Sequence, residues 1–254
     1  MLWRRQFLQG SALAAVALTL PTVAQAQAAV YCPILMYHYI AEPPADADRT
    51  LRDLCVTPQL FDEHLARLQA DGFATITAQT LAEALLSSTA LPPKPVVLSF
   101  DDGHDNAYGA AFPLLMARGM VGSFYIITGA MEAPRYLTWG QAAEMWNVGM
   151  EIGNHSASHA SLRGLKPERL PAETQGAADT IEAVLGRRPV TYCYPFGHFD
   201  DAARRAVRKS GHLAALTTQD GTLHRASDLY RLRRVRVRHT TTPDQLAWAV
   251  SRWV

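Results

Sequence analysis

Short apolar runs alternate with amphipathic stretches along most of this chain, and this alternation limits the fold more than any other feature. The predicted strands are 31–37, 73–77, 95–100, 121–127, 150–153, 190–195, 212–216 and 232–237. The predicted helices are 58–70, 79–87, 106–118, 139–147, 168–185, 200–210 and 243–252. Apolar runs that each lead into a helix are typical of βα units on a mostly parallel sheet. Seven or eight such units predict a barrel-like α/β fold.

Two of the predicted helices carry a clear start signal. Thr138 and Gln141 have the spacing of a capping box, and so have Thr242 and Gln245. Pro243 follows the second cap and suits the first helical position.

The first 26 residues predict an export signal. Arg4 and Arg5 precede an apolar stretch at 11–20 that is short for a membrane span, and an Ala-Gln-Ala cleavage pattern ends at Ala26. We expect 27–254 to form the mature catalytic domain, with a membrane anchor as the alternative reading. The paired arginines resemble a twin-arginine signal, and a Sec signal is the other route. Both routes predict a periplasmic or secreted bacterial protein.

Composition excludes several classes of protein. The 254 residues are 48% hydrophobic and 19% charged with net charge +1, which is typical of a globular chain and not of a disordered one. Loss of the signal removes two of the 24 basic residues, which leaves 22 against 23 acidic ones and argues against nucleic acid as a partner. Three cysteines without a CxxC pattern predict no cysteine zinc site. Outside the cytoplasm Cys32 and Cys55 could form a disulfide, and three buried thiols are the alternative.

Polar clusters follow four of the predicted strands. They are Tyr-His-Tyr at 37–39, Asp-Asp-Gly-His-Asp at 101–105, Asn-His-Ser-Ala-Ser-His at 154–159 and Phe-Gly-His-Phe-Asp at 196–200. The carboxyl ends of parallel strands meet on one face of a barrel, so we expect these clusters to form one active site.

Three residues in these clusters predict a metal centre. Two adjacent carboxylates, Asp101 and Asp102, repel each other unless a cation or a proton lies at one of them. The structural alternative is a simple turn, because Asp followed by Gly is a common turn signal. His155 and His159 are four apart, so on a helical turn both rings would share one face. Asp102, His155 and His159 together suit a catalytic divalent metal, with zinc expected first and cobalt or nickel as alternatives.

The same residues carry a family resemblance. Ser99 to Gly103 resembles the TFDDG motif of the polysaccharide deacetylases, carbohydrate esterase family four. His155 to His159 resembles the family's H-S/T-x-x-H motif, and Tyr194 to Gly197 resembles the core of its third motif. The resemblance extends over about 31–240. It implies a single-domain distorted (β/α)7-type barrel and removal of N-acetyl or O-acetyl groups from a glycan.

The resemblance also implies residue roles. Asp101 would be the general base, and Asp102, His155 and His159 would hold the metal. A backbone N–H near Phe196 would stabilise the oxyanion.

Two departures from the family pattern point to a subgroup. Cys193 stands where the third motif usually begins with arginine, and the late Leu-x-Leu-His that supplies the general acid is missing. Met36-Tyr-His38 and Leu232-Arg-Arg234-Val235 resemble the exported deacetylases of biofilm poly-β-1,6-N-acetylglucosamine instead. We therefore expect His38 to be the general acid and Arg234 to replace the missing arginine. His198 is the main alternative for the general acid, ahead of His104 and His239. The structural alternative for His38 is a buried histidine whose hydrogen bonds are satisfied inside the barrel.

Further side chains could contact a glycan. Alternation in the last predicted strand would place Arg234, Arg236 and Arg238 on one face, which favours an anionic glycan or a solvated edge strand over nucleic acid. Four aromatic residues could stack on sugar rings or belong to the core: Tyr37, Trp139, Tyr194 and Phe196.

These observations together predict a metal-dependent enzyme that removes N-acetyl groups from an N-acetylglucosamine-containing polysaccharide outside the cytoplasm. Exopolysaccharide export machinery is an expected partner, and no membrane span should remain after signal cleavage. Two alternatives stay open: a deacylase of a non-glycan amide or an O-acetyl ester, and a non-catalytic glycan-binding protein on the same scaffold.

Overall fold

A curled parallel sheet forms the centre of the computed structural model, which describes residues 29–252. The predicted signal at 1–26 lies outside the described residues. The sheet runs in the order β10-β9-β8-β7-β6-β2-β12, with β5 also paired to β6, and every pair in it is parallel. Its strands are β2 (Ile34–Tyr37), β5 (Ala74–Ile76), β6 (Pro95–Phe100), β7 (Ser123–Ile126), β8 (Glu151–Asn154), β9 (Thr191–Cys193), β10 (Ala214–Leu216) and β12 (Val235–Arg236). The predicted α/β barrel-like fold is confirmed.

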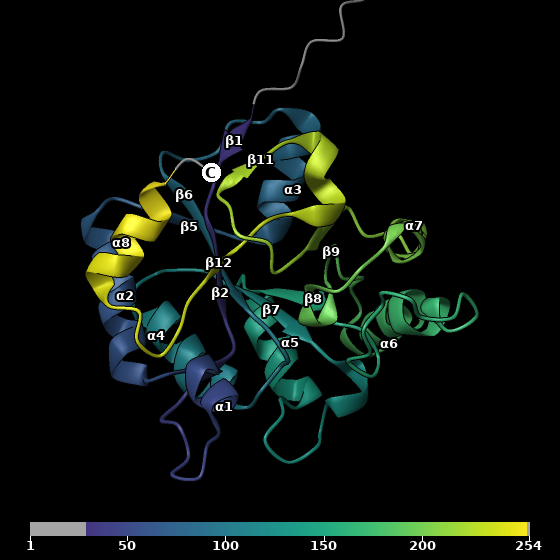
Figure 1. Cartoon of the computed structure of the whole chain (residues 1–254), viewed down its shortest axis with the longest axis horizontal. Helices are drawn as coiled ribbons and strands as arrows, with labels where there is room; N and C mark the ends of the chain where they lie inside the picture. The colour runs from purple at the N-terminus through teal and green to yellow at the C-terminus, as the bar shows by residue number, and fades with distance from the viewer. Residues whose placement is uncertain (1–28, 253–254) are drawn as a thin grey trace, which may run out of the picture.

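The two ends of this sheet meet. A parallel bridge joins Leu216, at the end of β10, to Leu232, which lies just before β12. The Leu232 N–H donates to the Ala215 carbonyl at 2.8 Å, and the Leu232 carbonyl accepts from the Thr217 N–H at 2.9 Å. The sheet therefore curls back on itself, with helices around it (Figure 1).

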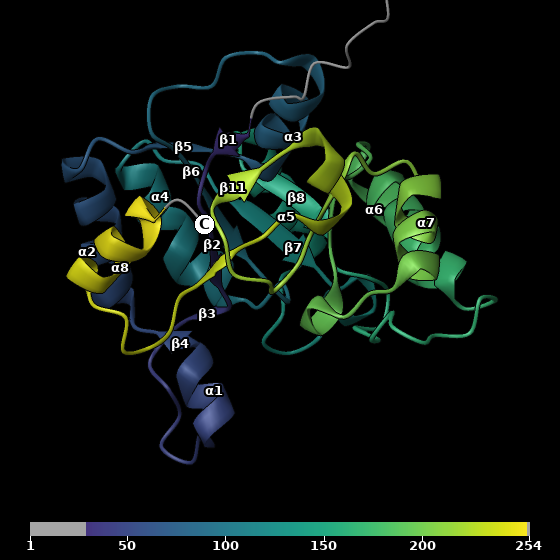
Figure 2. The ribbon, with the colours of Figure 1, turned by 45° about the horizontal axis from the view of Figure 1, so that its top comes forward.

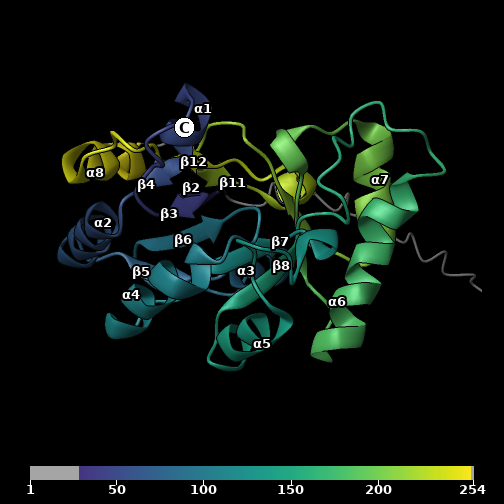
Figure 3. The same cartoon turned by 90° about the horizontal axis from the view of Figure 1, so that it is seen from below.

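Helices surround the sheet on its outer side. They are α2 (Pro58–Ala70), α3 (Ala78–Ser87), α4 (Phe112–Ala117), α5 (Trp139–Asn147), α6 (Ala177–Leu185), α7 (Asp201–Lys209) and α8 (Pro243–Ser251), whereas the short helix α1 (Arg49–Leu54) has no buried residue. Thr138 and Thr242 cap α5 and α8 with both hydrogen bonds of the predicted capping boxes. Helix α8 packs against α2, whereas α6 and α7 lie side by side on the other side of the barrel (Figure 3). Within the described part of the chain, no helix has the length and apolar character needed to cross a membrane.

Several elements differ from the sequence prediction. Pro33 has no N–H, and the predicted strand 31–37 divides there into β1 (Val30–Tyr31) and β2. Strand β1 pairs antiparallel with β11 (Leu223–His224) outside the main sheet. Helix α1 and the short strands β3 (Tyr39–Ile40) and β4 (Cys55–Val56) form an unpredicted excursion, which projects from the barrel in Figure 2.

Two predicted helices begin with a π-helical turn. The turn η1 (Ala107–Ala111) precedes α4, and η3 (Ala172–Gly176) precedes α6. Three short 3-10 helices complete the structure: η2 (Thr128–Ala130), η4 (Pro195–Gly197) and η5 (Ala226–Arg231). Single π-helical turns are frequent at functional sites, and η3 contributes a side chain to the site described below.

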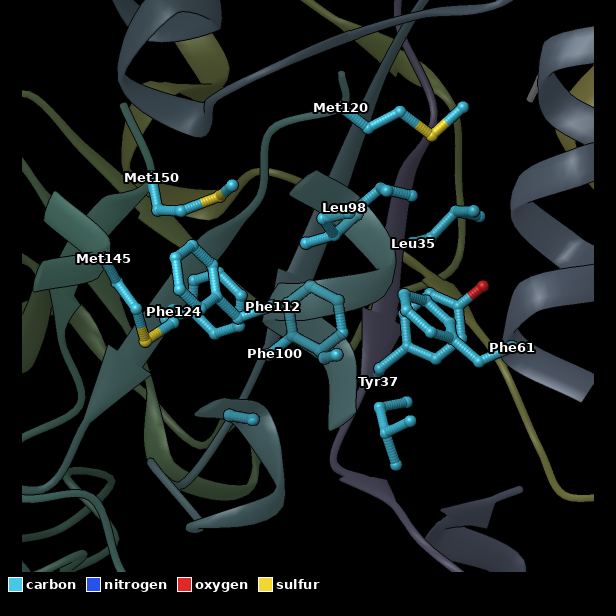
Figure 4. Close-up of a cluster of buried hydrophobic side chains, with 14 of the residues drawn as sticks. Leu35, Tyr37, Phe61, Leu98, Phe100, Phe112, Met120, Phe124, Met145 and Met150 are labelled. Atoms are coloured by element: carbon cyan, nitrogen blue, oxygen red, sulfur yellow. The ribbon is translucent and has the colours of Figure 1, made fainter. Parts of the chain in front are cut away.

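An aromatic core lies directly beneath the carboxyl ends of β2 and β6 (Figure 4). The Phe100 ring stacks on Phe124 with centroids 4.5 Å apart and on Tyr37 at 5.4 Å. Phe61 meets both Tyr37 and Phe100 edge-on. Because Tyr37 precedes His38 and Phe100 precedes Asp101, this packing fixes the backbone from which two predicted site residues project.

Of the four aromatic residues that could stack on sugar rings, two are buried in the core and two are at least partly exposed. Tyr37 and Tyr194 are buried, so they belong to the core. Phe196 is 55% exposed and Trp139 is half-buried. All three cysteines are buried free thiols, so a Cys32–Cys55 disulfide is not formed.

Candidate active site

Three of the four predicted clusters converge where the strands end. His38 follows β2, Asp101 and Asp102 follow β6, and His155 follows β8. The Asp101 N–H donates to the Tyr37 carbonyl at 3.0 Å, which ties the end of β6 to the end of β2. The parallel topology therefore brings these side chains to one face of the barrel.

Asp102 faces two histidines. Its Oδ1 atom lies 3.2 Å from Nε2 of His155 and 3.2 Å from Nε2 of His159. One ligand atom from each of the three residues falls within 4.8 Å of the others. Asp102 adopts a left-handed backbone with φ 72°, and Gly103 follows with φ 71°, so the chain turns sharply after β6. A Cβ at Gly103 would lie 3.2 Å from the Ile126 backbone, which explains the glycine.

His155 is oriented from its other ring nitrogen. Its Nδ1 lies 2.7 Å from the Cys193 carbonyl, which can only accept, so Nδ1 carries the proton. The Nε2 lone pair then faces Asp102 and is free to bind a cation. Metal-binding histidines commonly donate their second N–H in this way. Two imidazoles and one carboxylate with this orientation fit a divalent metal.

The expected helical turn between the two histidines is not present. Residues 155–161 form a loop, in which Ser156 (φ 73°) and His159 (φ 58°) are left-handed. The Asn154 side chain accepts from the Ser156 N–H, and the Ser156 hydroxyl accepts from the His159 N–H. Local polar capping, rather than a helix, thus brings the second imidazole back toward the first.

Glu173, on the π-helical turn η3, holds this loop and was not predicted from the sequence. Its buried carboxylate accepts from the N–H groups of Ala157 and Ser158 at 3.1 and 2.9 Å, and from the Ser158 hydroxyl at 2.7 Å. Nothing local in the sequence distinguishes this glutamate from a solvated helical one, because its partners lie 15 and 16 positions away.

Asp101 is bound by a buried arginine. Arg234, only 1% exposed, donates from its two terminal nitrogens to Oδ1 and Oδ2 at 2.7 and 2.8 Å. Burial would raise the pKa of Asp101, but the Arg234 charge and hydrogen bonds outweigh it and lower the pKa to about 2. His38 Nε2 lies 3.8 Å from Oδ2 of the same carboxylate. Asp101 is therefore an ionised carboxylate held in one orientation.

The other expected histidines have separate places. His104 is buried, its ring stacks on Tyr39 at 3.9 Å, and its Nε2 lies 3.5 Å from Oδ2 of Asp102. His198 is exposed and contacts Ser161, and His239 lies 3.7 Å from Asp53. Of these three, the structure places His104 against the carboxylate pair.

A family model described as polysaccharide deacetylase matches residues 88–215, which span β6 to β10 and both carboxylates. The chain belongs to the polysaccharide deacetylase family. The deacetylase is 29% identical over 205 residues to YxkH of Bacillus subtilis, covering 81% of this chain and 71% of that protein. It is 23% identical over 203 residues to the poly-beta-1,6-N-acetyl-D-glucosamine N-deacetylase of Staphylococcus epidermidis, covering 74% and 70%. The family expectation and the expectation of an enzyme are confirmed.

A solved structure extends the similarity to the whole barrel. The Streptococcus pyogenes deacetylase PplD, in complex with acetate, superposes with a TM-score of 0.80 at 27% identity. The match covers 88% of this chain and 99% of that one. The expected single-domain (β/α)7-type barrel agrees with this likeness.

The arginine run of the deacetylase has different surroundings along its length. Val235 and Val237 are buried in the apolar core, in keeping with the predicted alternation. Arg234 is buried at Asp101, whereas Arg236 and Arg238 are exposed and pair with Asp53, so the three arginines do not form a row of free charges. Cys193, in the place of the usual arginine, has its sulfur 3.6 Å from Oδ1 of Asp101.

Proposed function

We propose that this deacetylase is a metal-dependent hydrolase that removes N-acetyl groups from an N-acetylglucosamine-containing polysaccharide outside the cytoplasm. The observation that carries the proposal is the separation of two adjacent carboxylates. Asp102 faces His155 and His159, whereas Asp101 faces Arg234 and His38. One carboxylate is thus suited to hold a cation and its neighbour to accept a proton. The name of the Staphylococcus epidermidis relative supports the substrate class.

Asp102, His155 and His159 would hold the divalent cation, with zinc expected first and cobalt or nickel as alternatives. When bound, such a cation polarises the acetyl carbonyl and lowers the pKa of water at the site. The acidic and imidazole donors, without a cysteine in the set, suit this hydrolytic chemistry.

Asp101 is the proposed general base. It would accept a proton as water attacks the acetyl carbonyl carbon directly, without a covalent enzyme intermediate. Arg234 keeps Asp101 ionised and fixes its orientation through two parallel hydrogen bonds. These contacts support the assignment of Arg234 as the replacement for the arginine of the third motif.

His38 is the proposed general acid, which protonates the leaving amine. Burial lowers the pKa of His38, whereas the Asp101 and Asp102 charges favour its protonated form. Its Nε2 atom lies 3.8 Å from Oδ2 of Asp101, so the proposed acid and the proposed base are close enough to act on the same amide. His198 contacts Ser161 rather than either carboxylate, which favours His38 of the two candidates.

Phe196 is proposed to act through its backbone N–H on the oxyanion that forms at the acetyl carbon. Its left-handed backbone (φ 59°) turns the chain beside His159, whose ring lies 4.5 Å from the Phe196 ring. The exposed ring also offers a face on which a sugar can stack.

Export completes the proposal. Residues 1–26 would direct the chain out of the cytoplasm, and 27–254 would act on the polymer in the periplasm or after secretion. Exopolysaccharide export machinery is the proposed partner.

Acetate release from oligomers of β-1,6-linked N-acetylglucosamine, with zinc supplied, tests this function. An O-acetylated xylan is the comparison substrate and Asp101→Asn is the inactive control. We expect release from the amide substrate and a loss of about 10²–10⁴-fold in the variant. Release only from the acetyl ester would contradict the proposal and favour an O-deacetylase.

A further inference from the structure

A basic cleft lies between helix α7 and the 3-10 helix η5, apart from the carboxylate pair. Its volume is about 260 Å³. Four arginines and two residues with a hydroxyl group line it: Arg204, Arg205, Arg208, Arg231, Ser227 and Tyr230. The whole chain carries a net charge of only +1, so this is a local concentration of charge.

Half of the charge in the cleft is already balanced. Arg204 pairs with Asp201 at 2.9 Å, and Arg231 pairs with Asp228 at 3.0 Å. Arg205 and Arg208 form no ion pair with any residue in 29–252. The cleft therefore presents two positive charges that the described part of the chain does not neutralise.

Asp200 is the other acidic residue near the cleft, and its carboxylate interacts electrostatically with Arg205. Arg205 contributes to lowering the pKa of Asp200, although the larger causes are the hydrogen bonds from the Gly164 and Ala203 N–H groups. The two carboxylate oxygens of Asp200 accept these hydrogen bonds at 2.8 and 2.9 Å. Asp200 thus serves as the cap of α7 and does not close an ion pair with Arg205.

Helix stability explains only part of this arrangement. Arg208 lies in the last turn of α7, where a cation interacts favourably with the helix dipole. That effect does not account for Arg205 in the middle of the helix, nor for Arg231 on the opposite wall of the cleft. Arg205 and Arg208, which have no acidic partner within 29–252, make the potential at this cleft positive and favour an anion there.

We propose that this cleft binds the phosphoryl group of a phosphate monoester. A guanidinium presents paired N–H donors that match two phosphate oxygens. A monoester carries about −1.5 to −2 charges at neutral pH, close to the two unbalanced positive charges. The Ser227 hydroxyl also lines the cleft and can donate to a remaining oxygen, whereas the Tyr230 hydroxyl already donates to the His212 carbonyl at 2.9 Å.

Calorimetric titration with inorganic phosphate tests the site, at constant ionic strength and on chelator-treated protein so that no metal competes for the anion. Arg205→Gln and Arg208→Gln are the cleft variants. Arg233→Gln is the matched control, because it removes the same charge from an exposed position lining a neighbouring cleft. We expect saturable binding at one site, a Kd raised about tenfold or more in each cleft variant, and a change of less than about twofold in the control.

Equal weakening by all three variants, or binding that follows ionic strength without saturation, would overturn the proposal. A second arm uses vesicles that contain phosphatidic acid, whose headgroup is a phosphate monoester. Vesicle binding that inorganic phosphate displaces supports the phosphoryl site. Vesicle binding that phosphate does not displace, combined with no response to phosphate alone, would overturn it in favour of a membrane surface. Thermal unfolding of each variant checks that the fold is intact.

Discussion

Arg234 and Asp101 are 133 positions apart in the chain, yet the guanidinium donates two hydrogen bonds to the carboxylate, at 2.7 and 2.8 Å, in the interior of the barrel. The pairing depends on closure of the sheet, because the segment before β12 bonds to β10 and directs Arg234 inward. The Arg234 Nε also donates to the Thr217 carbonyl at 2.7 Å, which fixes the guanidinium plane. A buried pair of this kind fixes geometry more than it stabilises the fold.

Arg234→Lys should lower turnover by about 10²-fold or more, because an ammonium keeps the charge but cannot make two parallel hydrogen bonds. Metal content should stay unchanged, since Arg234 contacts Asp101 and not Asp102. Arg234→Ala should also destabilise the fold by about 3–5 kcal/mol by leaving Asp101 buried without its partner. Steady-state kinetics and urea unfolding check both expectations. Full activity in the lysine variant would rule out the orienting role.

His38→Ala should reduce turnover by about 10²–10⁴-fold with the metal still bound. The physical reason is the loss of the proton that the leaving amine requires. His198→Ala is the matched control, because that exposed histidine contacts Ser161 rather than the carboxylates. If the His198 variant loses the activity and the His38 variant keeps it, the acid is His198.

Glu173→Gln should weaken metal binding by about 10- to 100-fold while the fold is retained. The amide keeps the size of the side chain, but it can present only one acceptor oxygen to a loop that now donates to both. The left-handed His159 then loses its support. A metal titration measures the affinity, and the exposed Glu168→Gln serves as the control on the neighbouring segment. Equal affinities in the two variants would show that the loop holds its shape without Glu173.

The free energy of unfolding should decrease as the pH is lowered, because His212 is buried in its neutral form. Burial lowers the pKa of His212 to about 4, below its ordinary value of 6.5, so the unfolded chain takes up the proton first as the pH falls. The contribution of neutral His212 is complete above about pH 6.5 and is lost progressively toward pH 4. Between pH 7 and 5 this corresponds to about 2 kcal/mol. Urea unfolding of the wild type and His212→Gln should show the smaller pH dependence in the variant, and parallel pH curves would contradict the assignment.

The fold could be predicted from the sequence because its signals are local. Helices α2 and α5 occupy the predicted ranges 58–70 and 139–147, and β6 occupies 95–100. The capping boxes at Thr138 and Thr242 need only four residues each, so they can be seen without tertiary contacts. Helix α1 with β3 and β4 was missed, since two-residue strands have no periodicity to detect.

The site could be predicted less completely, for a physical reason. Asp101, Asp102 and His155 follow strands that are visible in the sequence, so their convergence follows from parallel topology. The loop that carries His159 was mistaken for a helical turn, because its left-handed residues are fixed by polar contacts from Glu173 and Asn154. Such contacts over long sequence separations leave no local pattern.

Metal binding is the property on which the proposed role of Asp102, His155 and His159 depends. The metal content and zinc affinity of the chain would be measured beside Asp102→Ala and His155→Ala, with His198→Ala as the control. We expect one equivalent of divalent metal in the wild type and the control, and its loss in the first two variants. A wild type that binds none after zinc, cobalt and nickel are offered, or variants that bind as well as the wild type, would contradict it.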